Sequence, residues 1–139
     1  MKRRTARENA FIVLFEMSFD TDTLEGLIAT SRELEEYAVD EYGEAILINY
    51  EAHRREVDEL ITSKLKDWTL ARLPRTSSAV LRLAVTEMLY ANEDMDSIVI
   101  NEAVEIAKIY CAEEDYQFIN GILGTIQRNK PEAQASEEQ

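Results

Sequence analysis

Apolar residues recur every three or four positions along most of this chain, the spacing of one buried face of an α-helix. The first such stripe occupies residues 10–17. Thr5, followed three residues later by Glu8, has the pattern of a capping box at a helix start. Residues 2–4 would then lie at or before the start of this helix, and Arg7 would lie in its first turn.

Later stripes have the same spacing and predict further helices. They occupy residues 24–28, with a turn or two more at 34–38, and then 44–67, 80–89, 100–107 and 119–126. Small polar residues suited to capping the last three are Thr76 or Ser77, Asn101 and Asp115. Residues 80–89 are apolar on nearly every side, which predicts a helix at the centre of the fold. The pattern predicts an all-α protein, a compact bundle of about six to seven helices.

Composition supports this prediction and limits the number of domains. The chain has 139 residues, of which 45% are hydrophobic, with only 4 Gly and 2 Pro to interrupt helices. This length is typical of one domain, which we assign to residues 1–130. Residues 131–139, which begin with Pro131 and continue as EAQASEEQ, have nothing to bury and are predicted to be a disordered acidic tail.

Charge is distributed unevenly along the chain. The formal net charge is −13, but residues 1–7 carry four bases and no acid, which leaves 11 bases against 28 acids elsewhere. The strong negative charge outside residues 1–7 argues against a protein that coats nucleic acid generally. A local basic site is still compatible with this charge, because salt screens distant charges. The apolar run after the basic residues, AFIVLF, ends at Glu16 and is too short for a signal peptide. No stretch of about 20 apolar residues predicts a membrane span.

Residues that carry catalytic or metal chemistry are scarce. His53, the one histidine, falls on a core-facing stripe and is interpreted as a packing residue. Cys111, the one cysteine, lacks an evident histidine partner and fits a reducing cytoplasm. Gly121 and Gly124 have the G-x-x-G spacing of an RNA-clamping loop. Because both fall in a predicted helix, we interpret them as positions that allow close helix packing. The sequence predicts that the protein is not an enzyme and that it binds neither a metal nor a cofactor.

Four blocks of sequence, in order, closely resemble the NusB family of bacterial transcription antitermination factors. They are RRTARENAFIVLF, VLRLAVTEMLY, INEAVEIAK and FINGIL, and the resemblance extends over about residues 3–127. It implies an all-helical fold of two packed helical subdomains. It also implies binding of the boxA element of nascent ribosomal RNA together with NusE, a small-subunit ribosomal protein. RNA polymerase would be an indirect partner, whose read-through of terminators the pair promotes.

The resemblance also implies roles for individual residues. Those expected to contact RNA are Lys2, Arg3, Arg4, Arg7, Gln117 and Phe118. Cations beside an aromatic ring suit single-stranded RNA, because the phosphates pair while the bases stack. Those expected on the face that meets NusE are Phe15, Ser77 and Glu114. From the residues alone, a solvated basic terminus and a core position for Phe118 are both open alternatives.

Several positions depart from the family pattern. They are Ile12, Ser77, Ser78, Thr86, Cys111 and Gln117. The change at Ser77 falls on the expected partner face, and Gln117 occupies a position that is often basic, which predicts weak RNA binding by the chain alone. Two other functions stay open: a helical protein–protein scaffold without RNA contact, and a module related to that of ribosomal RNA methyltransferases. Some members of the family pair with themselves, and nothing in this sequence decides between a monomer and a homodimer.

Overall fold

The computed structural model describes residues 1–91 and 93–130, and within these ranges the fold consists of helices without strands. Seven α-helices are joined by short connections, with one 3₁₀ turn and one π-helical turn. In chain order the elements are α1 (Arg3–Met17), α2 (Leu24–Leu34), α3 (Glu41–Ala52), α4 (Arg54–Thr62), η1 (Leu70–Arg72), α5 (Arg75–Thr86), η2 (Glu87–Ala91), α6 (Asp96–Tyr110) and α7 (Glu113–Arg128). The prediction of an all-α bundle of six to seven helices is confirmed.

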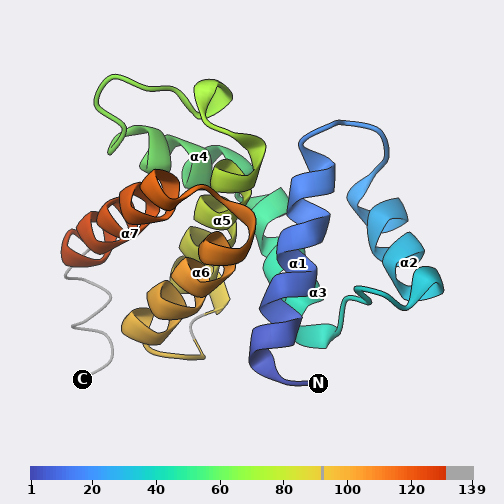
Figure 1. The fold of residues 1–139 in the computed structure, drawn as a ribbon. Coiled ribbons are helices and arrows are strands. Elements are labelled where there is room, and N and C mark those ends of the chain that lie inside the picture. The colour runs from blue at the N-terminus through green and yellow to red at the C-terminus, as the bar shows by residue number, and fades with distance from the viewer. Residues whose placement is uncertain (92, 131–139) are drawn as a thin grey trace.

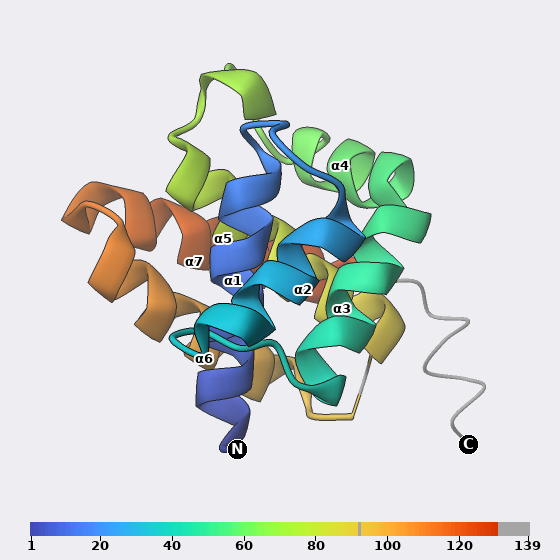
Figure 2. The same ribbon diagram turned by 90° about the vertical axis from the view of Figure 1, so that its right-hand side faces the viewer.

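The helices form two packed groups. Figure 1 shows α1, α2 and α3 on one side of the molecule and α4, α6 and α7 on the other, with α5 between them. Helix α5 packs against α1 and α3 on one flank and against α4, α6 and α7 on the other. The second view shows α2 and α3 together across the front of α1 (Figure 2). This arrangement agrees with the two packed subdomains that the resemblance implied.

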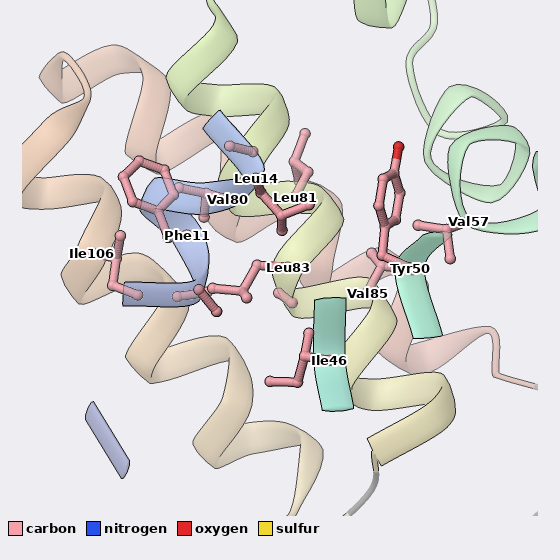
Figure 3. Close-up of a cluster of buried hydrophobic side chains, with 14 of the residues drawn as sticks. Phe11, Leu14, Ile46, Tyr50, Val57, Val80, Leu81, Leu83, Val85 and Ile106 are labelled. Atoms are coloured by element: carbon pink, nitrogen blue, oxygen red, sulfur yellow. The ribbon is translucent and has the colours of Figure 1, made fainter. Parts of the chain in front are cut away.

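The hydrophobic core is centred on α5, as the all-round apolar segment predicted. Nine of its residues are buried, and the side chains of α1, α3, α4 and α6 close around them (Figure 3). The labelled members of this cluster are Phe11, Leu14, Ile46, Tyr50, Val57, Val80, Leu81, Leu83, Val85 and Ile106. Burying aliphatic side chains of this size contributes roughly 1.5–3 kcal/mol each, so the two groups of helices are held together mainly through α5.

The start of α1 differs from the predicted one. The helix begins at Arg3, with Lys2 as its N-cap and no capping side chain, so Thr5 lies inside the helix and the predicted capping box is wrong. Contacts to other helices decide this boundary, because ion pairs from Arg3, Arg4 and Arg7 to distant acidic residues stabilise the extra helical turn. The consequence is functional, since these three arginines now point from the sides of a helix.

The predicted long helix over residues 44–67 is two helices. Helices α3 and α4 are separated at His53, whose backbone leaves the helical region at φ −121° and ψ 24°. The prediction of a core position for His53 is therefore wrong. Its side chain is 35% exposed, and its ring stacks on Tyr90 with the ring centroids 4.0 Å apart. The pattern of apolar residues continues across the break because both helices cover the same core.

Three other helix starts were predicted at the wrong residue. Helix α5 begins after Pro74, α6 begins after Met95, and α7 begins after Ala112, and none of these N-caps supplies a capping side chain. The predicted caps Asn101 and Asp115 lie inside their helices, because both helices begin earlier in the chain than expected. Acidic residues in the first turn stabilise these earlier starts, since they interact favourably with the helix N-terminus. The tail prediction for residues 131–139 falls outside the described residues.

No helix in the described part of the chain combines the length and the apolar character needed to cross a bilayer.

Candidate functional site

Arg4, in the first turn of α1, lies against an acidic residue of α6. Its guanidinium donates two hydrogen bonds to the Glu102 carboxylate, from Nε at 2.9 Å and from Nη2 at 2.7 Å. The hydrogen bonds from Arg4 lower the pKa of the Glu102 carboxyl, although its partial burial acts in the opposite direction. The Arg4 side chain is still 62% exposed, so a phosphate could approach it from solvent.

Arg3 is held on the other side of the same helical turn. Its Nη1 donates to Asp94 at 3.1 Å, and its guanidinium lies over the Tyr42 ring at 3.8 Å from the centroid. Lys2, at the N-cap, is exposed and forms no ion pair with any described residue. The basic terminus of the chain is therefore partly neutralised by the protein's own carboxylates before any ligand binds.

Arg7 requires a correction, because it is not available on the surface. Its side chain is 3% exposed, and its guanidinium donates to Glu87 of η2 and to Asp94. Burial alone would lower the pKa of Arg7, but hydrogen bonds to Glu87 and Asp94 outweigh it and raise that pKa. Tyr42 also donates to Glu87, so Tyr42 and Asp94 extend the buried ion pair of Arg7 and Glu87 into a network of four side chains. Arg7 serves this network instead of presenting a free cation to RNA.

Phe118 lies at the other predicted RNA-binding position, on α7. Its ring is partly buried against the core, and its free side lines a hollow of about 620 Å³ between α7 and the connection that follows α4. Trp68 and Lys64, from that connection, line the same hollow. Gln117, the neighbour of Phe118, is exposed. Phe118 is thus at the edge of the core, where its position beside the apolar stripe suggested.

The basic terminus and the Phe118 hollow are not adjacent. The two ribbon views share a vertical axis, and in both of them the connection after α4 lies at the top and the start of α1 at the bottom (Figures 1 and 2). Because this connection lines the hollow, the hollow lies far from the first turn of α1. The hypothesis of one helical tip with a neighbouring ring must therefore be replaced by two separate surfaces.

The residues expected on the partner face lie on three helices, Phe15 on α1, Ser77 on α5 and Glu114 on α7. Phe15, on α1, is half-buried and contacts Phe19 edge-on at a centroid separation of 5.1 Å. Ser77 requires a correction, since it is 1% exposed and its hydroxyl donates to Cys111 at 3.9 Å. Cys111 is itself partly exposed, and Glu114, three residues later, is exposed in the first turn of α7. Phe15 and Glu114 are accessible to a partner, whereas Ser77 is not.

Sequence reasoning missed two kinds of residue. Asp94 and Glu102 pair with the basic terminus from about 90 and 98 positions away, and no local pattern signals such pairs. Trp68 was also not singled out, although it is the one tryptophan of the sequence and lies in the segment KLKDW, after two lysines and Asp67, and it lines the hollow beside Phe118.

Comparison with known proteins gives a consistent result. The model of the NusB family matches residues 4–128. The transcription antitermination protein NusB of Bacillus mycoides (strain KBAB4) is 40% identical over 127 residues, which cover 91% of this chain and 97% of that protein. The protein of the same name from Bacillus cereus (strain ATCC 10987 / NRS 248) is 41% identical over the same coverage.

Solved structures agree with these relatives. T. maritima NusB superimposes with a TM-score of 0.83 at 30% identity and covers 98% of both chains. A chain in a crystal structure of a plectonemic RNA supercoil gives a TM-score of 0.84 at 27% identity, with 92% of this chain and 96% of that chain covered. A crystal structure of the antitermination factors NusB and NusE in complex with dsRNA gives 0.81 at 25% identity, with 91% and 96% covered.

Proposed function

The chain belongs to the NusB family, and we propose that it acts as a transcription antitermination factor that binds boxA-type leader RNA together with a NusE-like ribosomal protein. Relatives at 40% identity over nearly the whole chain are named transcription antitermination proteins, and one similar structure holds NusB with NusE and dsRNA. The pair would act on the polymerase indirectly and in the cytoplasm, and the chain itself would not be an enzyme.

The observation that carries this proposal is a small set of accessible cations on a strongly acidic body. Lys2, Arg3 and Arg4 extend from the first turn of α1, while the whole chain has a net charge of −13. Three phosphate contacts on a single strand correspond to a salt slope of about −2 in the logarithm of affinity against the logarithm of salt concentration. This is a modest contribution, and the acidic remainder of the protein opposes it.

Internal pairing makes the chain alone a weak RNA binder. A phosphate that binds Arg4 must compete with Glu102, which accepts two hydrogen bonds from that guanidinium, and one that binds Arg3 must compete with Asp94. Arg7 acts as a positioning residue, since its buried ion pair with Glu87 holds the turn that carries the other two arginines. Phe118 and Gln117 add a second contact on α7.

A basic partner would offset this weakness. Phe15 and Glu114 offer an apolar ring and a carboxylate on an exposed face, and complementary charge accelerates encounter with a basic ribosomal protein. In the assembled pair, the partner would supply the additional cations that the RNA backbone requires. Cooperative binding of RNA is therefore the expected behaviour.

The test is a mobility-shift titration of leader RNA with this chain, with the NusE-like partner and with both. We expect the pair to bind at a far lower concentration than either protein, and we expect this advantage to shrink as salt increases, because the pair neutralises more phosphates. Equal affinity with and without the partner would refute the cooperative assembly. A scrambled RNA of the same length and composition controls for unspecific binding to phosphates.

One observation favours a second function. Because each arginine of α1 is already paired with a carboxylate, the chain could act as a protein–protein scaffold whose basic terminus never meets RNA. Replacing Arg4 by Ala separates the two functions. Weaker RNA binding by the assembled pair supports direct contact, and unchanged binding supports the scaffold.

A further inference from the structure

A cavity of about 630 Å³ lies where the end of α1, helices α3 and α4, and the start of α5 meet. It shares no lining residue with the hollow beside Phe118. Three arginines line it, Arg54 of α4 and Arg75 and Arg82 of α5, and we call it the arginine cavity. Its volume lies within the roughly 300–1,000 Å³ that is typical of small-molecule sites. Cations are therefore gathered around a space that is large enough for a small organic ligand.

One wall of the arginine cavity is fixed and neutral. Arg82 donates from Nε and Nη2 to the Asp58 carboxylate at 3.1 and 3.3 Å. The hydroxyl of Tyr50 donates to the same carboxylate at 3.0 Å. Tyr50 is 3% exposed, and its hydroxyl points away from Ile46 and Val85 of the core (Figure 3). This wall is thus already ordered in the free protein, and its two charges cancel.

Arg54 and Arg75 differ, because they have no counter-charge. Neither forms an ion pair with any carboxylate in the described ranges, and both are exposed. The Arg54 guanidinium lies over the Tyr50 ring, 5.5 Å from its centroid. That of Arg75 lies over the Phe19 ring at 4.4 Å and donates to the backbone carbonyl of Ser18. These contacts hold the two guanidiniums in position without neutralising them.

The charges that line the arginine cavity leave an excess of one positive charge. Three arginines face two carboxylates, those of Asp58 and Asp20, whereas the whole chain has a net charge of −13. Asp20 is exposed and competes with any anion for the nearby guanidiniums. A ligand with several negative charges overcomes this competition better than a monovalent anion does, because each guanidinium can then have a charge of its own.

The start of α5 supplies an independent observation. Pro74, its N-cap, offers no capping side chain, and the first turn carries Arg75 and no acidic residue. Pro74, Arg75 and Ser78 all line the cavity. The first N–H groups of a helix have no intrahelical acceptor and form its positive end, where a cation is unfavourable and an anion is favourable. Among the described α-helices only α1, which carries the proposed RNA contacts, also lacks an acid in its first turn.

We propose that the arginine cavity binds a nucleoside di- or triphosphate, with its phosphates at Arg54, Arg75 and the start of α5. Guanidiniums suit phosphate because they donate two parallel hydrogen bonds, and helix N-termini bind the same group. The nucleoside would pack on the apolar wall formed by Leu14, Leu70 and Leu73. The inference goes beyond the proposed function and does not depend on it, since the cavity lies at the end of α1 and the cations proposed for RNA lie at its start.

The experiment is a calorimetric titration of the full chain with the sodium salts of ATP and GTP at low ionic strength. We expect saturable binding of one nucleotide per chain, with affinity falling from triphosphate to diphosphate to monophosphate. ATP and GTP should bind similarly, because the wall that meets the nucleoside is apolar. Inorganic tripolyphosphate should bind more weakly than either, and equal binding would overturn the assignment of a nucleoside to the cavity.

Four variants give matched pairs. Arg54→Gln and Arg75→Gln should each weaken nucleotide binding by about 10-fold, the usual effect of losing a hydrogen bond to a charged group. Arg55→Gln removes the neighbour of Arg54, which does not line the cavity, and Arg72→Gln removes an exposed arginine of η1 that also lies outside it. Both controls should bind like the wild type. All four should melt like the wild type, because each replaces an exposed side chain.

Asp20→Asn tests the same site through a gain of affinity, which misfolding cannot produce. The substitution removes the carboxylate that competes with the ligand, so nucleotide binding should tighten several-fold. Asp22→Asn, which removes an exposed carboxylate two residues later that does not line the cavity, is its control. Equal gains for both variants would indicate general charge attraction and would overturn the site.

The remaining outcomes separate this inference from the proposed function. Absence of saturable binding at millimolar ATP and GTP overturns the inference, and the mobility-shift result for leader RNA stands by itself. Nucleotide binding with the expected variant pattern supports the inference even if the chain binds no RNA. If leader RNA displaces the nucleotide and Arg75→Gln weakens RNA binding equally, the cavity is part of the RNA surface and the nucleotide assignment is overturned.

Discussion

Arg7 of α1 and Glu87 of η2 form a buried ion pair, with Nη2 and Oε2 2.6 Å apart although the residues are 80 positions apart in the chain. Both side chains are almost fully excluded from solvent, at 3% and 1% exposure. Tyr42 donates to the same carboxylate, and Asp94 accepts from the same guanidinium. The pair thus joins the first helix to the turn that follows the central helix, and it sets the direction in which Arg3 and Arg4 project.

Arg7→Ala should lower the free energy of unfolding by about 3–5 kcal/mol, because it leaves the Glu87 carboxylate buried without its counter-charge. Arg7→Lys should recover only part of this loss, since an ammonium cannot donate in parallel to both carboxylate oxygens. Urea denaturation followed by circular dichroism measures both variants. Arg4→Ala is the matched control, and a loss as large as that of Arg7→Ala would contradict the distinction between the two arginines.

Glu102→Gln should raise RNA affinity several-fold. The substitution keeps the size of the side chain but weakens its hold on Arg4, so a phosphate competes for that guanidinium more easily. Fluorescence anisotropy with leader RNA measures the change. Glu105→Gln removes a carboxylate from the same helix that pairs with Lys108 instead, and it should have a smaller effect. Lower affinity for Glu102→Gln would show that Glu102 orients Arg4 for binding.

The same ion pair should contribute to the pH dependence of stability. Because the hydrogen bonds from Arg4 lower the pKa of Glu102 in the folded state, the stabilisation is present above the ordinary carboxyl pKa of 4.5 and disappears as the pH falls through the lowered value. Wild type and Glu102→Gln should therefore differ by a constant amount between neutral pH and about pH 5 and converge in stronger acid. Denaturation curves across this range test it, and a difference that grows in acid would reverse the sign.

Arg4→Ala should reduce the salt dependence of RNA binding. One phosphate contact fewer on a single strand changes the slope of log affinity against log salt by about 0.7. The partner should be present in both series, so that binding stays measurable over the salt range. Arg55→Ala, which removes an exposed arginine from α4, serves as a control for net charge. An equal change in slope for both variants would indicate a diffuse electrostatic effect without a defined contact.

Phe15→Ala should weaken binding of the NusE-like partner by about 10-fold or more, since aromatic residues at the centre of an interface carry a large share of its energy. RNA binding by the chain alone should be unchanged. Calorimetric titration of the partner provides the measurement. Ile48→Ala, which shortens an exposed apolar side chain on α3, is the control for loss of surface hydrophobicity. If both variants bind the partner like the wild type, Phe15 is not part of the interface.

Local patterns were sufficient for the existence of the helices and insufficient for their ends. The stripe at residues 10–17 and the apolar segment at 80–89 are both helical, and the second is central as expected. The predicted start at Thr5 and the predicted continuity through His53 are wrong. A helix boundary depends on a small difference in free energy, which an ion pair from another helix outweighs.

The candidate site divides in the same way. The basic residues at the N-terminus and the position of Phe118 at the edge of an apolar stripe were visible in the sequence, as was the family. That Arg7 is buried, that Ser77 is covered and that Trp68 shares a hollow with Phe118 could not be predicted from spacing. Each of these depends on which distant helix lies alongside.

The sequence by itself determined that this protein is a helical bundle with a central apolar helix and a positive start, because helical periodicity and charge act over a few residues. Only the tertiary structure decided which cations are free, since Arg4 meets Glu102 and Arg7 meets Glu87 through packing across the whole domain. The physical reason is the distance along the chain over which each interaction acts. A hydrophobic stripe within one segment identifies the buried face of a helix, but the ion-pair partner of a charge depends on which distant segment packs beside it in the folded protein.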